Sequence, residues 1–117
     1  MNQTADDCVF CKIVSGDIPA DVLGRNEHAI SFKDLNPQAP FHALVVPVDH
    51  YANAAASAAA DPAILGHAVA LADEVAKAAG NGDYRLVINT GAGVGQTVFH
   101  THVHVLGGAP GMTESLI

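Results

Sequence analysis

The sequence predicts an α+β domain whose sheet is mainly antiparallel, and three observations support this fold class. Four short segments rich in apolar and β-branched residues have the length of strands. One longer stretch, residues 62–79, has the apolar spacing of an amphipathic helix and lies between the second and third segments. Pro-rich or Gly-rich connections join the strands on either side of this helix, which favours antiparallel pairs.

The strands are predicted as two pairs. The first pair is residues 28–35 and 42–48, separated by the turn NPQAP, and the second is residues 84–89 and 98–106, joined by the loop TGAGVGQT. This Gly-rich loop leads into a strand instead of a helix, and no Lys follows it, so it lacks the context of a dinucleotide or phosphate loop. Two interpretations remain: a plain hairpin turn, or a loop whose backbone N–H groups approach a phosphate.

The helix at residues 62–79 has recognisable ends. Asp61 can cap its start, Pro62 suits the first turn, and Gly80 can end it. His67 falls on the polar side and is expected to be an ordinary solvated residue. The apolar face is predicted to comprise Leu65, Ala68, Val69, Ala72, Val75, Ala76 and Ala79.

Length and composition predict one small folded domain with an acidic surface. The chain has 117 residues, of which 50% are hydrophobic and 15% charged, which argues against disorder. The formal charge of -7, with only five Lys and Arg, makes the chain a poor candidate for binding the backbone phosphates of DNA or RNA. A phosphate-bearing small molecule remains a reasonable ligand, because backbone N–H groups and imidazoles can hold it.

The N-terminus and the cysteine count bear on location. The first ten residues, MNQTADDCVF, contain no basic region, and no apolar run reaches membrane length. We therefore expect neither a signal peptide nor a transmembrane helix, and no membrane partner. Two cysteines without an export signal favour a reducing compartment, so the cytoplasm is the expected location.

Three histidines alternate near the end of the chain, at positions His100, His102 and His104. On a strand they share one face, with successive imidazoles roughly 6.7 Å apart along the chain. One metal ion cannot easily be reached by all three, because its ligands sit about 2 Å away. Neutral imidazole is also a nucleophile near neutral pH. The middle histidine, with a hydrogen-bonding neighbour on each side, is the natural candidate for attack at phosphorus.

The segment HTHVHVL matches the His-x-His-x-His-apolar-apolar signature of the histidine triad family. Three longer segments resemble the branch of histidine triad nucleotide-binding proteins: CVFCKIVSGDIPA (8–20), SFKDLNPQAPFHALVVPVDH (31–50) and YRLVINTGAGVGQTVFHTHVHVLGG (84–108). In order and spacing, the resemblance covers most of the chain from Cys8 to Gly108.

The resemblance implies a single histidine triad domain over residues 1–117, with its core in 8–108 and a C-terminal tail in 109–117. It implies a mainly antiparallel five-stranded sheet, one long helix and a short N-terminal helix. Members of this branch form symmetric homodimers and hydrolyse nucleoside phosphoramidates and related nucleotidyl compounds, typically of purines. The tail APGMTESLI lacks the Trp of many relatives, which puts the leaving-group preference in doubt.

The resemblance also implies catalytic roles. His102 attacks the α-phosphorus and forms a nucleotidyl-histidine intermediate, which water then cleaves. The backbone carbonyl of His100 orients His102, and His104 hydrogen-bonds a phosphate oxygen. Gln96 and Thr97 lie at the phosphate and the leaving group, where the Thr97 hydroxyl helps to protonate a departing amine. Many relatives have Ser at the Thr97 position.

The rest of the implied nucleotide site comes from three other parts of the chain. Asn89 and the backbone around Gly95 complete the phosphate site, which favours the functional interpretation of the Gly-rich loop. Asp34 binds the ribose hydroxyls; the alternative is that Asp34 merely forms the turn before NPQ. The apolar wall of the base pocket comprises Val9, Phe10, Ile13, Phe32 and Leu35.

Cys8 and Cys11 form a Cys-x-x-Cys pair that is ambiguous by itself. In bacterial-type relatives such a pair binds zinc together with two histidines, which correspond here to His50 and His100. The resemblance therefore implies a structural Cys2His2 zinc site that also braces the segment carrying His102. Free thiols and a disulfide are the alternatives.

Two other functions stay open at this point. The chain could be a dinucleoside polyphosphate hydrolase, as in a related branch of the family. It could instead be mainly a nucleotide-binding or interaction module with little turnover. His28 and His42 are expected to be structural, although His42 matches a residue that is frequent in the family.

Overall fold

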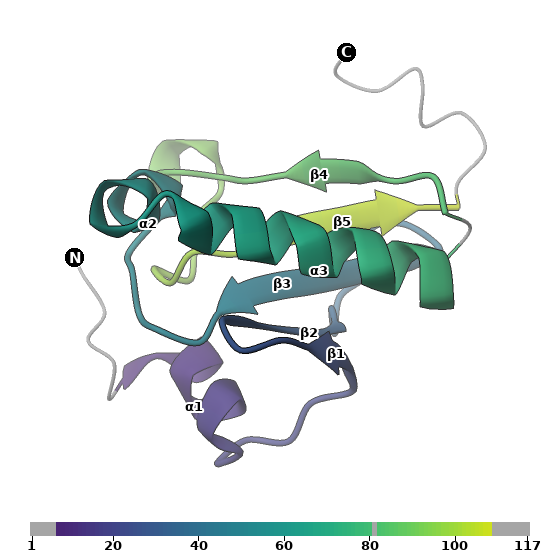
Figure 1. Ribbon diagram of the computed structural model, residues 1–117, viewed down its shortest axis with the longest axis horizontal. Helices are drawn as coiled ribbons and strands as arrows, with labels where there is room; N and C mark the ends of the chain where they lie inside the picture. Colours follow the sequence, from purple (N-terminus) through teal and green to yellow (C-terminus); the bar gives the residue numbers. More distant parts are fainter. Residues whose placement is uncertain (1–6, 81, 109–117) are drawn as a thin grey trace.

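The computed structural model describes residues 7–80 and 82–108, and it shows the expected α+β fold (Figure 1). Five antiparallel strands form one sheet in the order β1-β2-β3-β5-β4. The strands are β1 (Val22–Arg25), β2 (Ala29–Lys33), β3 (Phe41–Pro47), β4 (Arg85–Val87) and β5 (Val103–Gly107). The helices are α1 (Val9–Ser15), α2 (Ala54–Ala60) and α3 (Ala63–Ala79), with a single 3-10 turn, η2 (Ala92–Val94). The predicted tail, residues 109–117, lies outside the described residues.

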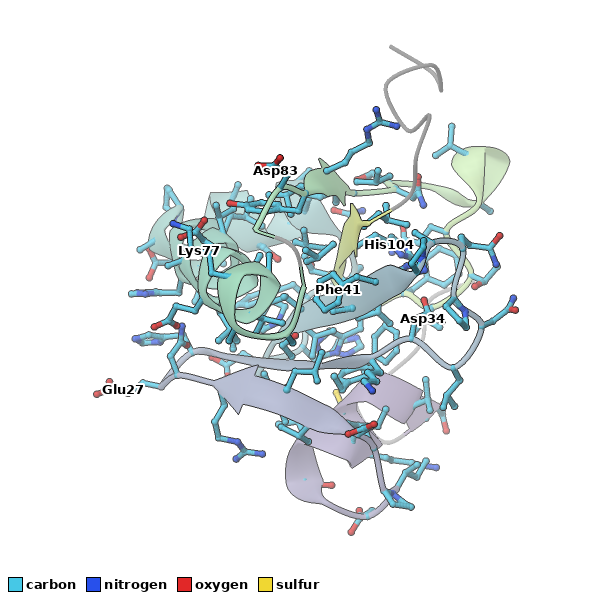
Figure 2. All side chains as sticks on the ribbon, turned by 90° about the vertical axis from the view of Figure 1, so that its right-hand side faces the viewer. Glu27, Asp34, Phe41, Lys77, Asp83 and His104 are labelled. Carbon is cyan, nitrogen blue, oxygen red and sulfur yellow. The ribbon has the colours of Figure 1, made fainter. Side chains whose placement is uncertain are left out.

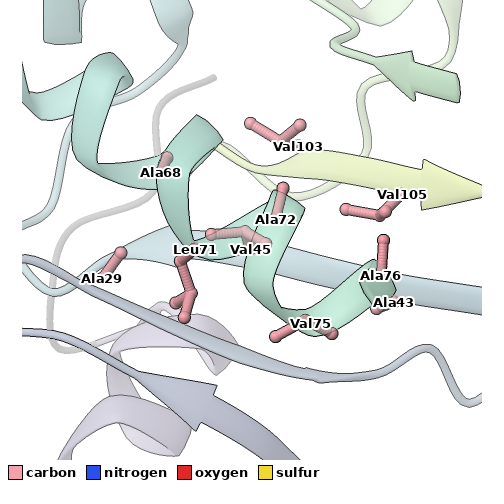
Figure 3. Packing of buried hydrophobic residues seen from close by; sticks show 10 residues of the cluster. All are labelled: Ala29, Ala43, Val45, Ala68, Leu71, Ala72, Val75, Ala76, Val103 and Val105. Carbon is pink, nitrogen blue, oxygen red and sulfur yellow. The ribbon is translucent and has the colours of Figure 1, made fainter. Parts of the chain in front are cut away.

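The long helix is confirmed as α3, which crosses one face of the sheet (Figures 1 and 3). Asp61 accepts a hydrogen bond from the Ala63 N–H at 3.0 Å, so it caps the helix as predicted. The predicted apolar face is slightly misplaced, because Val69 is 41% exposed whereas Leu71 is only 2% exposed. The buried residues of α3 are Ile64, Ala68, Leu71, Ala72, Val75 and Ala76.

The sheet has two buried faces with different partners. Side chains alternate along a strand, so Ala43, Val45 and Val105 face α3 (Figure 3). The intervening residues of β2 and β3 pack with Cys8 and Phe10 around α1 on the opposite face. His104 lies in β5, which pairs with β3 on one side and with β4 on the other. Because His104 alternates with Val105, it points to the α1 face, where the pocket described below lies.

The N-terminal helix α1 is short and begins at the first cysteine. The Cys8 sulfur accepts a hydrogen bond from the Cys11 N–H at 3.4 Å, which caps the helix. Gly16 ends it in the left-handed region, with φ of 87°, a conformation that favours glycine. The helix is therefore held by the same pair of cysteines that the sequence marks as candidate metal ligands.

The last strand begins later than the predicted range of 98–106, because β5 starts only at Val103. His100 and His102 precede it and are not part of the ladder. Their segment pairs instead with the chain after β3, where the Thr101 N–H donates to the Tyr51 carbonyl at 2.8 Å. The alternation of the three histidines therefore reflects an extended lead-in followed by a strand, of which only His104 is a member.

No helix among the described residues is both long and apolar enough to cross a membrane.

Candidate active site and metal centre

The two nitrogens of His102 have different environments. Its Nδ1 lies 2.8 Å from the carbonyl oxygen of His100. A carbonyl only accepts, so Nδ1 carries the proton in this hydrogen bond, and the neutral ring keeps a lone pair on Nε2. His102 is 8% exposed and lines the pocket. Its backbone geometry therefore fixes the tautomer that the sequence analysis expected.

His104 is held in the opposite tautomer by a chain of hydrogen bonds. The Gln38 N–H donates to Nδ1 of His42 at 2.9 Å, so in neutral His42 the proton is on Nε2. That nitrogen lies 2.9 Å from Nδ1 of His104, which must then accept. Neutral His104 consequently presents Nε2–H as a donor. The Nε2 of His42 also lies 3.3 Å from a carboxylate oxygen of Asp34.

Both of these rings are neutral at physiological pH. Burial, together with the neighbouring His102 and His42, lowers the pKa of His104 to about 4, against the opposing effect of Asp34. Burial also lowers the pKa of His42, again opposed by Asp34. A neutral His104 can donate one proton into the pocket without carrying a charge.

A pocket of about 340 Å³ lies between α1, the end of β2, β3 and the histidine segment. This volume falls in the range of small-molecule sites, and the lining is mostly apolar. Asp34 and His104 lie on the same side of the molecule (Figure 2). The pocket is lined by Val9, Phe10, Ile13, Ile18, Pro19, Ala20, Phe32, Lys33, Asp34, Leu35, Leu44, Thr97, Val98, His102 and His104.

Most of the sequence-predicted nucleotide site meets in this pocket. All five apolar residues proposed for the base wall line it, as do Asp34, Thr97, His102 and His104. Within the described part of the chain, three predicted residues are not in the lining: Asn89, Gly95 and Gln96. Gly95 has φ of 102° and donates its N–H to the Ala92 carbonyl within the 3-10 turn.

Asp34 forms the turn that the sequence left as an alternative, and its side chain also lines the pocket. One carboxylate oxygen accepts a hydrogen bond from the Asn36 N–H at 2.8 Å, which is the turn expected before NPQ. The other faces His42, and the side chain also lines the pocket. Leu35, next to it, is 97% exposed at the pocket mouth. The turn thus holds a carboxylate at the entrance without consuming all of its acceptor sites.

A second cluster lies beside the histidine segment. Cys8, Cys11, His50 and His100 offer four ligand atoms that all lie within 4.8 Å of one another, a group that could hold a metal ion. The two Nδ1 atoms of the histidines are 3.2 Å apart, and the Cys11 sulfur is 3.3 Å from Nδ1 of His50. Both cysteines are free thiols.

The hydrogen bonds around His100 fit a metal ligand. Its Nε2 lies 2.8 Å from the Pro47 carbonyl and must donate, so Nδ1 directs a lone pair at the two sulfurs. Burial, with His50 and His102 nearby, lowers the pKa of His100 to about 4 and keeps the ring neutral. Burial and Cys8 raise the pKa of the Cys11 thiol to about 11, so a bound metal would have to displace its proton.

A second group, Asp34, His42 and His104, has similar spacing but different hydrogen bonding. The Gln38 N–H occupies Nδ1 of His42, so Nε2 of that ring carries the proton and has no lone pair for a metal. Of the two groups found among the described residues, the Cys2His2 group therefore combines suitable spacing with a histidine, His100, whose lone pair faces the other ligand atoms.

Sequence reasoning missed part of the site. His42 was expected to be structural, yet it fixes the proton on His104. Leu44 faces His104 directly across the β3–β5 pair, and His42 is its diagonal neighbour. The alternation of HALVVP indicates that His42 and Leu44 share a face. Only the register with β5, which the sequence does not specify, shows that this face is that of His104. Pocket residues Ile18, Pro19, Ala20 and Val98 were also missed.

The sheet order, the apolar pocket and the His-x-His-x-His segment that ends in β5 together define a histidine triad domain. Comparison with known proteins agrees. The HIT domain model matches residues 15–111, so the chain belongs to the HIT domain family. Cys8 and Cys11 lie before the matched residues.

Three relatives illustrate the similarity. A HIT-like protein of Synechocystis is 49% identical over 107 residues, which cover 91% of this chain and 94% of that protein. The structure of a HIT family hydrolase from Clostridium thermocellum has a TM-score of 0.90 and 38% identity, covering 97% of this chain and 100% of the other. That of a HIT family hydrolase from Legionella pneumophila has a TM-score of 0.82 and 40% identity, covering 88% and 94%.

Proposed function

We propose that this protein is a hydrolase that cleaves purine nucleoside phosphoramidates, or related nucleotidyl conjugates, and releases a nucleoside monophosphate. The observation that carries the proposal is the tautomer of His102, whose Nε2 lone pair is left for a substrate in an apolar pocket. The names of the two structural relatives support a hydrolase. The donor at His104 and the carboxylate at Asp34 support a substrate with a phosphate and hydroxyl groups.

In the first step, Nε2 of His102 attacks the α-phosphorus, and the bond from phosphorus to the amine nitrogen breaks. The electron pair of that bond leaves with the amine, which needs a proton. The Thr97 hydroxyl lines the pocket and is the proposed proton donor. The Nδ1 proton of His102 remains hydrogen-bonded to the His100 carbonyl and stabilises the ring as it becomes positively charged.

In the second step, water attacks the same phosphorus and gives one proton back to the Thr97 oxygen, and Nε2 of His102 leaves with the bonding pair. Neutral His102 and the nucleoside monophosphate are then released. Nε2–H of His104 is proposed to donate to a non-bridging oxygen throughout, where negative charge increases in each transition state. Because His42 fixes this tautomer, the donor needs no reorganisation before the reaction.

The remaining pocket residues would bind the nucleoside. Asp34 is proposed to accept from ribose hydroxyls, using oxygens beyond the one committed to Asn36. The base would lie against the apolar wall around Phe10, Phe32 and Ile13. The side chains of this wall are apolar, so they form no hydrogen bond that would select adenine over guanine. Asn89, Gly95 and the Gln96 backbone remain proposed phosphate neighbours.

We propose Zn²⁺ for the Cys2His2 group, because two thiolates and two imidazoles are a closed, tetrahedral zinc donor set. Cys8, Cys11, His50 and His100 would hold it. The ion would supply no chemistry at phosphorus. It would fix α1 and His100, whose carbonyl orients His102.

A homodimer is also proposed. The edge strand β4 has only β5 as a neighbour in the described sheet. Two apolar side chains beyond it are exposed, Ile88 at 40% and Val94 at 66%. Pairing two β4 edges would cover these residues and extend the sheet.

Turnover of adenosine 5′-phosphoramidate tests the proposal. We expect the purified protein to release AMP, and His102→Ala to release none while keeping its zinc content and AMP affinity. The matched control is His67→Ala, which changes a histidine of α3 outside the pocket lining and should leave turnover intact. If the wild-type protein binds AMP but hydrolyses neither phosphoramidates nor dinucleoside polyphosphates, the chain is a binding module and the proposal is wrong.

A further inference from the structure

The side chain of Gln96 makes three hydrogen bonds, all to backbone groups. Its Oε1 accepts from the Gly91 N–H at 2.9 Å. Its Nε2 donates to the Ala52 carbonyl at 2.7 Å and to the Val98 carbonyl at 3.1 Å. The residue is only 2% exposed. The carboxamide thus joins the Gly-rich loop, the segment after His50 and the start of the histidine segment.

These partners fix the orientation of the amide. Gly91 supplies a donor, so the oxygen must face it, while Ala52 and Val98 supply acceptors, so the nitrogen must face them. Both N–H bonds and one of the two lone pairs of Gln96 are therefore used within the protein. A phosphate needs donors, and this side chain has none left to offer. This differs from the role expected from the resemblance, in which Gln96 itself lies at the phosphate.

The same residue closes the Gly-rich loop. The Gln96 N–H donates to the Gly91 carbonyl at 3.2 Å, while the Gly91 N–H donates to the Gln96 side chain. This reciprocal pair brings the two ends of the loop together. Gly91 has φ of 102°, a backbone conformation that favours glycine. The loop is therefore held in one shape by a buried polar side chain and a glycine.

Thr97 lies between two residues, Gln96 and Val98, whose positions depend on the hydrogen bonds of the Gln96 side chain. The residue before it is Gln96 itself, and the carbonyl of the residue after it, Val98, is bound by the Gln96 side chain. Thr97 is exposed and lines the pocket. A side chain that holds the backbone on both sides of Thr97 also holds the Cβ that carries its hydroxyl, and so limits where that hydroxyl can lie.

We propose that Gln96 is a positioning residue that holds the Thr97 hydroxyl at the leaving group, and that its side chain does not bind the phosphate. This inference rests on the proposed function, because it assigns Gln96 to the proton transfer of that reaction. The effect of Gln96 is confined to the step in which the phosphorus–nitrogen bond breaks, because only there does a departing amine take up a proton.

Two substrates separate this role from phosphate binding. An alkylamine leaving group needs the proton from Thr97, whereas p-nitrophenolate leaves as a stable anion and needs none. We expect Gln96→Met, which keeps the length but removes the polar atoms, to lower kcat for the adenosine phosphoramidate by roughly 100-fold, the usual effect of a misplacement of about 1 Å. Turnover of the p-nitrophenyl ester of AMP and the affinity for AMP should change little.

Thr97→Val is the matched variant, because it removes the proposed proton donor and leaves the hydrogen bonds of the Gln96 side chain in place. It should reproduce the substrate dependence of Gln96→Met, and the double variant should be no worse than either alone. If Gln96→Met instead weakens AMP binding and slows both substrates equally, Gln96 binds the phosphate and the inference is wrong. If kcat for both substrates is unchanged and only the melting temperature falls, Gln96 has a purely structural role, which also overturns the inference.

A measurement on the wild-type protein covers the case in which Gln96→Met does not fold or the protein has no turnover. The side-chain amide protons of Gln96 should exchange slowly with solvent and keep their NMR chemical shifts when AMP saturates the pocket. A large shift on AMP binding would place the amide at the phosphate and overturn the inference. Absence of wild-type turnover with both substrates would instead refute the proposed function. The exchange result would still decide whether the Gln96 amide is bound to the backbone or to the phosphate.

Discussion

At the scale of single residues, the chemistry of the site depends on which nitrogen of each histidine carries the proton. Backbone carbonyls of His100 and Pro47 set the tautomers of His102 and His100, and the Gln38 N–H sets that of His42. The backbone partner of each ring therefore decides whether it offers a lone pair or an N–H group, which is the basis of the roles proposed for His102, His100 and His104. The Pro47 carbonyl is 53 residues from His100 in the sequence. The partners of His102 and His42 are only two and four residues away, but they reach the rings only in this backbone conformation. The motif alone therefore indicates chemistry but not the role of each nitrogen.

Ser31 provides a test of polar burial under α3. Its hydroxyl is buried and is the one buried side-chain N or O atom of the described residues that has no hydrogen-bond partner. Ser31→Ala should therefore raise the free energy of unfolding by about 1 kcal/mol in urea titrations. Ser57→Ala is the matched comparison, because the Ser57 hydroxyl is 2.6 Å from that of Thr101. It should lower stability by about 1–3 kcal/mol, and an equal loss in both variants would contradict this account.

His104 predicts a pH dependence of stability. Its pKa falls from 6.5 in the unfolded chain to about 4 in the fold, so the unfolded state binds the extra proton first. The stability contributed by neutral His104 is full above pH 6.5 and is lost as the pH falls towards about 4. The slope is at most about 1.4 kcal/mol per pH unit, reduced by the solvent that reaches the ring.

The variant His104→Gln isolates this effect. Free energies of unfolding measured from pH 4 to pH 8 should fall less steeply with acid in the variant than in the wild type. The two proteins differ only at residue 104, so the difference between the two curves reports on His104. Parallel curves would show that His104 is not held neutral by the fold.

At the scale of elements, four of the five strands and the long helix follow from local sequence, whereas β1 (Val22–Arg25) was not predicted and the ends of the elements depend on tertiary contacts. The segment VFHTHVHVL predicts a strand from residue 98, yet Thr101 bonds to Tyr51 and the ladder starts at Val103. Likewise, helical spacing permits Val69 or Leu71 as a core residue. The fold selects Leu71, which lies over Gly24, where an added Cβ would be 3.4 Å from its side chain.

The packing of α3 gives a prediction at this scale. Leu71→Ala should lower the free energy of unfolding by about 2–5 kcal/mol, because it leaves a cavity between α3 and the sheet. Val69→Ala, two residues away on the exposed side, should change it by no more than about 0.5 kcal/mol. Thermal and urea unfolding of both variants measure the difference. If Val69→Ala lowered the free energy of unfolding more than Leu71→Ala, the core face of α3 would be the one expected from the sequence, and this account would be wrong.

At the scale of the whole molecule, the candidate metal ligands bring together elements that are far apart in the sequence. Cys8 and Cys11 begin α1, His50 follows β3, and His100 precedes β5. The resemblance identified these four residues, and the spacing of Cys8 and Cys11 alone did not. The pocket likewise could be anticipated only by resemblance, since its wall comes from α1, from β2 and β3 with the turn after β2, and from the histidine segment. The paired register that brings His42 to His104 was not predictable from the sequence.

Removal of the metal tests this connection. With free zinc at about 1,000 times its Kd, binding should stabilise the fold by about 4 kcal/mol, so a chelator should lower the melting temperature by on the order of 10 °C. Cys11→Ser should lose the metal and show the lower melting temperature without chelator. His28→Ala, which changes a histidine outside the metal group, should behave as the wild type. A melting temperature insensitive to chelation would contradict a structural metal.

The central claim is that His102 forms a covalent bond to phosphorus, and the stereochemistry of the reaction tests it most directly. A substrate made chiral at the α-phosphorus with sulfur and hydrolysed in isotopically labelled water reveals the configuration of the product. Two successive in-line displacements, first by Nε2 of His102 and then by water, predict overall retention. Inversion would show that water attacks the substrate directly, and would contradict the role assigned to His102.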